Sequence, residues 1–147
     1  MVLRDWRFQR ESEHKMSAWR RAAIKRIPTQ RALVERSESV GMLWVDLWLC
    51  FVDAHREPVD EKTIRGVYDF AKWTCEEARN DEMATSTCCH FYEHLPTEPL
   101  VRAQLRKFMT RGEVSELSAI FKYHLSEEEY LRFMGEVGAA NKCKPRI

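Results

Sequence analysis

The chain has 147 residues, of which 44% are hydrophobic and 11% aromatic, with five Gly and five Pro. These values exclude a disordered chain and are typical of one helical domain with a core of its own. The formal net charge is +1, but residues 1–36 hold ten Lys or Arg against four Asp or Glu. This basic region has a net charge of +6 and leaves −5 for the remainder.

The basic region of residues 1–36 has two interpretations. It is either an arm that binds nucleic acid or another anionic partner, or a basic helix that lies against the acidic remainder of the chain. We favour the second, because no basic block exceeds two residues and acidic residues interrupt the run: Glu11, Glu13 and Glu35.

The cysteine content and the apolar runs predict a cytoplasmic protein. Five cysteines without a C-x-x-C spacing argue for a reducing compartment rather than a disulfide framework. The sequence start carries no apolar signal core. The longest apolar run, Val40 to Ala54, contains Asp46 and Asp53 and is too short to span a bilayer.

The first predicted helix runs from Asp5 to Ile27, where Pro28 ends it. Thr29 is placed to cap a short helix that ends at Arg36. The next helix, Val40 to His55, is apolar around most of its circumference, which is typical of a central helix.

Capping signals divide the rest of the chain. Asp60 begins a helix that extends to Ala78, and Asn80 begins one that extends to Leu95, where Pro96 ends it. A helix from Pro99 to Met109 follows. The last two helices begin with capping boxes, and Gly138 ends the final one: Thr110 with Glu113, and Ser126 with Glu129.

No segment alternates with a period of two, so we predict no sheet. The chain is expected to be all-α, with residues 1–147 in one compact domain and residues 139–147 as a frayed tail. About six to seven helices in consecutive antiparallel hairpins would form a bundle or a short armadillo-like array.

The sharpest local motif is H-x-x-E-H at His90, Glu93 and His94. Two His one turn apart can bind one Zn²⁺, and a nearby Glu can act as general base on its water. A continuous helix, however, would place Glu93 almost opposite the core direction set by Cys88 and Phe91, on the solvent face. We therefore expect no metal or cofactor, and keep a small metal-dependent hydrolase as an alternative.

Two other groups have a structural explanation that we favour. Asp46 and Asp53 lie seven residues apart on one helix face, which predicts a narrow polar strip that reaches solvent or a basic residue. Cys88 and Cys89 could be a redox pair, but a disulfide between neighbours in a helix is strained. Neither phosphate-loop nor dinucleotide motifs occur.

Three segments between Ile64 and Tyr130 resemble an uncharacterised family of small bacterial helical proteins. They read Y-x-F-A-x-W-x-C from Tyr68, F-Y-E-H-L-P from Phe91, and F-x-Y from Phe121. The resemblance implies a bacterial origin and an all-helical fold. It carries no known activity, so it assigns no catalytic role.

The leading functional hypothesis is a non-enzymatic helical domain that binds another protein. It depends on the absence of a catalytic motif and on five Trp in a small domain, of which Trp48 and Trp73 are the candidate contact residues. The third hypothesis is an anionic-partner or nucleic-acid binder that uses the basic region. The oligomeric state and the partner are left open.

Overall fold

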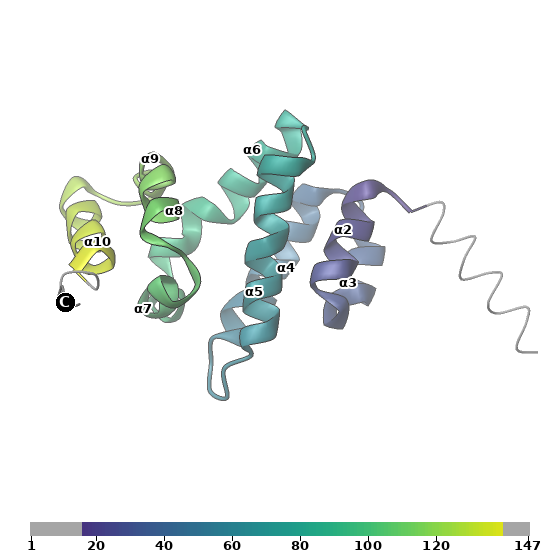
Figure 1. Cartoon of the computed structure of the whole chain (residues 1–147), viewed down its shortest axis with the longest axis horizontal. Helices are drawn as coiled ribbons and strands as arrows, with labels where there is room; N and C mark the ends of the chain where they lie inside the picture. Colours follow the sequence, from purple (N-terminus) through teal and green to yellow (C-terminus); the bar gives the residue numbers. More distant parts are fainter. Residues whose placement is uncertain (1–15, 140–147) are drawn as a thin grey trace, which may run out of the picture.

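The computed structural model describes residues 16–139. Helices account for most of these residues and pack around one hydrophobic core. Nine α-helices and no strand occur among these residues, so the predicted fold class is confirmed. Figure 1 shows the helices side by side, from α2 (Ala18–Arg26) at one end to α10 (Glu127–Ala139) at the other. None of the described helices is long and apolar enough to cross a membrane.

The helix bounds follow the predicted order, with short 3₁₀ or π segments (η) between them. The segments between the two end helices are η1 Pro28–Gln30, α3 Arg31–Arg36, α4 Val40–Ala54, α5 Glu61–Lys72, η2 Trp73–Glu77, α6 Asp81–His90, η3 Tyr92–Thr97, α7 Pro99–Phe108, α8 Arg111–Glu116 and α9 Ser118–Phe121.

Helix α4 lies at the centre of the core, as predicted. Its inward side chains, Leu43, Trp44, Leu47 and Phe51, are fully buried. The Trp44 ring stacks on Phe91 with centroids 4.7 Å apart, so α4 is joined to the segment that follows α6. Buried aromatic contacts of this kind add to the free energy of area burial.

Most of the N-terminal side-chain caps predicted from the sequence are present in the structure. Asp60 accepts a hydrogen bond from the Thr63 amide, and Asn80 accepts one from the Met83 amide. Both predicted capping boxes are present, at Thr110 with Glu113 and at Ser126 with Glu129. Caps satisfy amides that have no partner within the helix.

The N-terminal prediction needs correction where the structure describes it. Ser17 is extended, with φ −59° and ψ 154°, so the helix does not run unbroken through residues 16 and 17; residues 1–15 lie outside the described residues. Thr29 is inside the 3₁₀ segment rather than at a cap, because Pro28 already starts a helical turn.

Helix α2 packs on the body of the protein, against α5. The two helices touch at Gly66, where an added Cβ would lie 2.3 Å from the Arg26 carbonyl oxygen. A glycine at this contact allows the two backbones to approach closely. The described part of the basic region is therefore a packed helix rather than a free arm.

The helix predicted from Asn80 to Leu95 breaks at Phe91. Its α-helical part ends at His90, Phe91 takes φ −124° and ψ −69°, and a 3₁₀ segment continues to Thr97. Pro96 explains the change, because its ring clashes with the carbonyl four residues earlier in an α-helix. The break changes which side chains point inward.

The C-terminal helices also differ from the prediction. Residues 110–121 form two short helices separated at Leu117, and α10 continues through Gly138 to Ala139. The inward side chains of α10 are Phe133 and Val137, whereas Leu131 is 63% exposed. The predicted tail beyond Ala139 lies outside the described residues.

Candidate functional site

The structure separates the three side chains of the H-x-x-E-H motif. His90 is exposed and lies beside Gly41 of α4. Glu93 is 8% exposed and points inward, so its expected place on the solvent face was wrong. The cause is the break at Phe91, which ends the helical periodicity that the prediction assumed.

Glu93 and His94 instead belong to a column of side chains at the junction of η3, α4 and the segment after α9. Glu93 Oε2 lies 3.1 Å from His124 Nε2. The His124 ring stacks on the His94 ring, with centroids 4.6 Å apart and an interplanar angle of 17°. The His94 ring in turn contacts Trp48, with centroids 5.8 Å apart.

Ring stacking and one hydrogen bond hold this column together. The rings of His94 and His124 lie almost parallel, and His124 Nε2 already contacts Glu93. Burial, and then the neighbouring His124, lower the pKa of His94. Among residues 16–139, no three His, Cys, Asp or Glu side chains are grouped so that they could hold a metal ion.

An exposed apolar stripe runs along the outer side of α4. Met42, Val45 and Leu49 are 52%, 58% and 70% exposed. Their spacing of three and seven residues puts them on one helix face, and the half-exposed Val52 continues it. We call these four residues the α4 stripe. Clustered exposed apolar side chains mark interaction surfaces more often than single ones do.

Acidic residues border the α4 stripe. Asp46 and Asp53 are exposed on the same helix face, so the predicted polar strip that reaches solvent is confirmed. Arg56 approaches Asp53, with Nε 3.7 Å from Oδ1, at the C-terminal end of the stripe. The outer side of α4 is thus apolar along one line and acidic along the next.

The two Trp residues proposed from the sequence are half-buried. Trp48 packs beside Phe51 and His94 at the edge of the α4 stripe. Trp73 stacks on Phe70, with centroids 6.3 Å apart. The most exposed apolar side chains of α4 are therefore aliphatic rather than aromatic.

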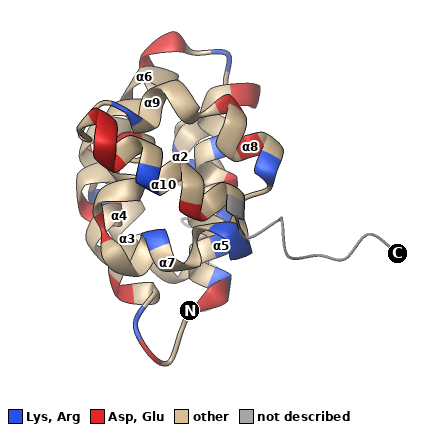
Figure 2. Ribbon diagram, turned by 90° about the vertical axis from the view of Figure 1, so that its left-hand side faces the viewer, with Lys and Arg blue, Asp and Glu red and all other residues tan. Residues whose placement is uncertain are grey.

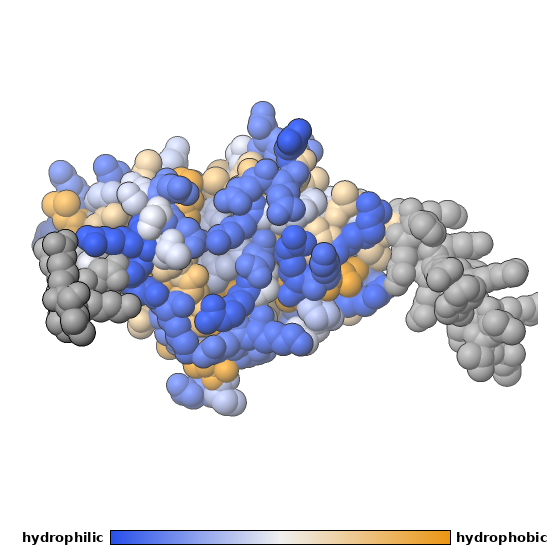
Figure 3. All heavy atoms as spheres, viewed as in Figure 1, coloured by the Kyte–Doolittle hydropathy of each residue, from blue (hydrophilic) through white to orange (hydrophobic). Residues whose placement is uncertain are grey.

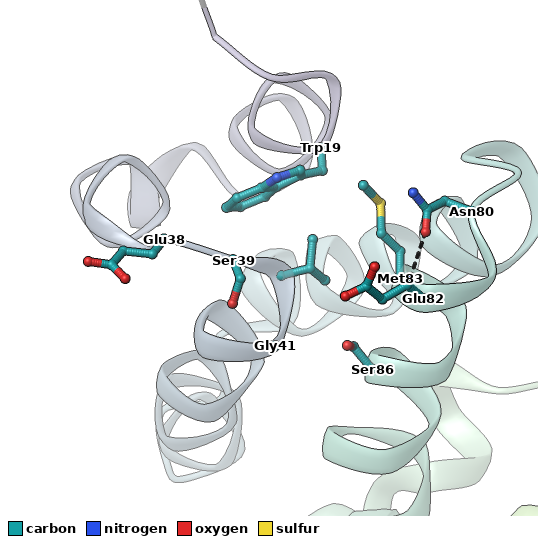
Figure 4. A pocket seen from close by; sticks show the side chains of 9 residues that line it. Trp19, Glu38, Ser39, Gly41, Asn80, Glu82, Met83 and Ser86 are labelled. Atoms are coloured by element: carbon teal, nitrogen blue, oxygen red, sulfur yellow. Dashed lines mark hydrogen bonds between the residues drawn. The ribbon is translucent and has the colours of Figure 1, made fainter.

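A small pocket of about 260 Å³ opens beside the N-terminal end of α4 (Figure 4). The Trp19 ring covers it from α2, and Met83, Glu82 and Ser86 line it from α6. Asn80 is held at its rim by the capping bond to the Met83 amide. The pocket mixes apolar walls with carboxylates and holds no nucleophile set that would indicate catalysis.

A broader groove between α2 and α5 is basic. It has a volume of about 560 Å³ and is lined by Lys25, Arg26, Lys62 and Arg65 together with Asp69 and Gly66. The face of the molecule that carries α2 and α5 is largely hydrophilic (Figure 3). At the α10 end of the molecule, basic and acidic residues are instead interspersed (Figure 2).

Comparison of the chain with family models, with curated proteins and with solved structures finds no match. The resemblance through the F-Y-E-H-L-P segment therefore stays a prediction. Within that segment the structure gives Glu93 and His94 a local role, as members of the packed column that also contains His124 and Trp48.

Proposed function

We propose that this protein is a helical protein-binding domain whose docking surface is the α4 stripe. The observation that carries the proposal is the exposure of Met42, Val45 and Leu49 on one face of a helix whose opposite face is buried in the core. Burying such side chains on binding would contribute about 25 cal/mol per Å² of apolar surface.

The surface suits a partner helix with an apolar face and basic flanks. From Met42 to Val52 the α4 stripe spans eleven residues, and its ends lie about 15 Å apart along the helix axis. This length matches apolar anchors spaced over about three turns of a partner helix. Asp46 and Asp53 would face the flank of that helix, so Lys or Arg there would complement them.

The test uses two designed amphipathic peptides with the same apolar face, one with Lys flanks and one with Glu flanks. Binding to the full chain is measured by fluorescence anisotropy. We expect the Lys-flanked peptide to bind more tightly, and Leu49→Glu to weaken its binding by at least about tenfold, because a charge would be buried in the interface.

Leu131→Glu is the matched control, since Leu131 is an equally exposed leucine on α10. It should leave peptide binding unchanged. The proposal fails if neither peptide binds, or if the two Leu→Glu variants have the same effect. Light scattering on the protein alone tests whether a second copy of the chain covers the α4 stripe. If the protein is a dimer and Leu49→Glu makes it monomeric, the proposal that a helix of another protein binds there is overturned.

A second candidate function is binding of an anionic partner, including nucleic acid, in the groove of Lys25, Arg26, Lys62 and Arg65. The four cations that line one groove favour it. A fluorescent single-stranded oligonucleotide should bind with an affinity that falls steeply with salt. Lys25→Glu with Lys62→Glu should abolish that binding, and binding that persists in 0.5 M salt, roughly ten times the low-salt condition of such assays, would contradict it.

A further inference from the structure

The pocket of about 260 Å³ lies where two capped helices begin, beside α2. Ser39 caps α4 and Asn80 caps α6 through their side-chain oxygens, which fixes the first turn of each helix. Gly41 leaves space at the floor of the pocket, where an added Cβ would lie 3.6 Å from Ser86 Oγ. The pocket is therefore formed by three packed helices rather than by loops.

Three side chains give the pocket apolar walls. The Trp19 ring lies across it, as Figure 4 shows, and the side chain is only 8% exposed. Val40 is buried and Met83 is half-buried, and both line the same space. An alkyl chain in the pocket could pack against all three, and the π face of an indole also attracts cations.

Two polar groups point into the space beside the Trp19 ring. They are the carboxylate of Glu82 and the hydroxyl of Ser86, one turn apart on α6 (Figure 4). Neither group has a hydrogen bond or an ion pair with another residue of the described range 16–139. Both can accept a hydrogen bond from an ammonium group, and the carboxylate supplies the opposite charge.

The charges around the pocket favour a cation. Helices α4 and α6 both begin there, so the positive ends of two helix dipoles, each about half a charge, lie close to it. The two carboxylates that line the pocket, Glu38 and Glu82, exceed that sum. Arg20 places its guanidinium 4.3 Å from the centroid of the Trp19 ring, but it donates to the Ser37 carbonyl and does not line the pocket.

We propose that this pocket binds a primary alkylammonium group. Glu82 and Ser86 accept hydrogen bonds from the ammonium, and the alkyl chain packs on Trp19, Val40 and Met83. The volume lies just below the range of about 300–1,000 Å³ that holds drug-sized ligands, so it suits a short chain. A lysine side chain of another protein and a free small amine share this chemistry.

The test follows the Trp19 indole by fluorine NMR of the full-length chain labelled with fluorotryptophan. The chain has five Trp, and the Trp19 signal is the one that is absent from Trp19→Phe. Titration with n-butylammonium at neutral pH should shift this signal with a dissociation constant in the millimolar range, as expected for a ligand of so few atoms. The amide signals of Gly41 and Ser86 report the same binding if Trp19→Phe fails to fold.

Two comparisons test the charge recognition. The alcohol 1-butanol has nearly the same shape without the charge and should bind at least about fivefold more weakly. Glu82→Gln should weaken n-butylammonium binding by about fivefold. The matched control is Asp81→Asn, because Asp81 is the neighbouring exposed carboxylate but does not line the pocket; it should change the affinity by less than about twofold.

A second probe separates the two sources of the ammonium group. In N-acetyl-lysine N-methylamide the ammonium is on the side chain, and the flanking peptide groups imitate a protein chain. Binding as tight as that of n-butylammonium, and equally weakened by Glu82→Gln, would support a lysine of a partner protein. Binding of n-butylammonium alone would support a free amine. No shift of the pocket signals, equal binding of 1-butanol, or equal effects of Glu82→Gln and Asp81→Asn would each overturn the proposal.

Discussion

Glu93 Oε2 lies 3.1 Å from His124 Nε2, and this contact joins the 3₁₀ segment after α6 to the turn after α9. Glu93 is buried while the His124 side chain is 41% exposed. The imidazole thus covers a carboxyl group that would otherwise lack a hydrogen-bond partner, which is costly for a buried polar group.

Substitution His124→Ala should lower the free energy of unfolding by about 1–2 kcal/mol, because Glu93 loses its hydrogen bond. Urea unfolding measures the change. A double-mutant cycle with Glu93→Gln should give a coupling energy on the order of 1 kcal/mol. His90→Ala is the control, since that side chain is exposed and should matter little. Equal effects of the two His→Ala variants would refute the structural role of the contact.

The Thr87 hydroxyl is a buried hydrogen-bonding centre that accepts from Trp44 Nε1 at 2.9 Å and also contacts Thr74. Thr87→Val keeps the shape but leaves the indole N–H unsatisfied, so we expect a loss of about 2 kcal/mol in unfolding free energy. Thr85→Val, at an exposed position of the same helix, should be close to neutral. A neutral Thr87→Val would show that the indole finds another acceptor.

Two glycines should respond to alanine in opposite directions. Gly66→Ala forces a Cβ against the Arg26 carbonyl and should destabilise by about 1–3 kcal/mol, as overpacking does. Gly135→Ala meets nothing within 4 Å in α10 and should stabilise by about 0.5–1 kcal/mol through helix propensity. Thermal unfolding of both variants provides the comparison, and a stabilising Gly66→Ala would contradict the close packing of α2.

Stability should fall as the pH decreases from about 7.5 to 5.5. His55 is buried, its Nδ1 donates to the Phe51 carbonyl oxygen at 2.7 Å, and burial lowers its pKa below the usual 6.5. Below pH 6.5 the unfolded chain therefore binds more protons than the folded chain does. The stability that neutral His55 contributes above that pH is lost as the pH falls toward the pKa of His55 in the folded state. His94 acts in the same direction.

Urea midpoints for wild type and His55→Phe check this dependence, because Phe keeps the ring and removes the titration. The variant should have a flatter pH dependence over the same interval. Folding also lowers the pKa of some carboxylates, such as Asp60 and Glu113. These groups change the stability only when the pH falls below their ordinary pKa values near 4. An unchanged slope in His55→Phe would assign the effect to other groups.

Most helices of this fold could be predicted because their signals are local. Asp60 and Asn80 cap the helices that follow them, and the capping box at Thr110 forms as its spacing indicates. Helix α4 was correctly placed in the core. The exposed polar strip at Asp46 and Asp53 was predicted too, since two carboxylates seven residues apart seldom lie inside without partners. The exposed apolar residues beside it were not predicted: Met42, Val45 and Leu49.

The candidate site could not be predicted from a regular helical wheel, because it depends on breaks in the helices and on tertiary contacts. The wheel assumed 3.6 residues per turn up to Leu95, whereas Pro96 converts the last turns to 3₁₀ geometry and directs Glu93 inward. The π turn after α5 likewise has no recognised sequence signal, so the buried hydrogen bond between Thr74 and Thr87 could not be foreseen. His124 lies 31 residues from Glu93, and such a pairing depends on tertiary packing.

Helix α10 closes one end of the array (Figure 1). It is attached mainly by the edge-to-face contact of Phe133 with Phe121 and the ion pair of Arg102 with Glu136, whereas α4 has neighbours on several sides. We therefore expect α10 to detach before the rest of the domain unfolds. Amide hydrogens of α10 should exchange with deuterated solvent through such partial openings, well before those of α4, which exchange only when the whole core opens.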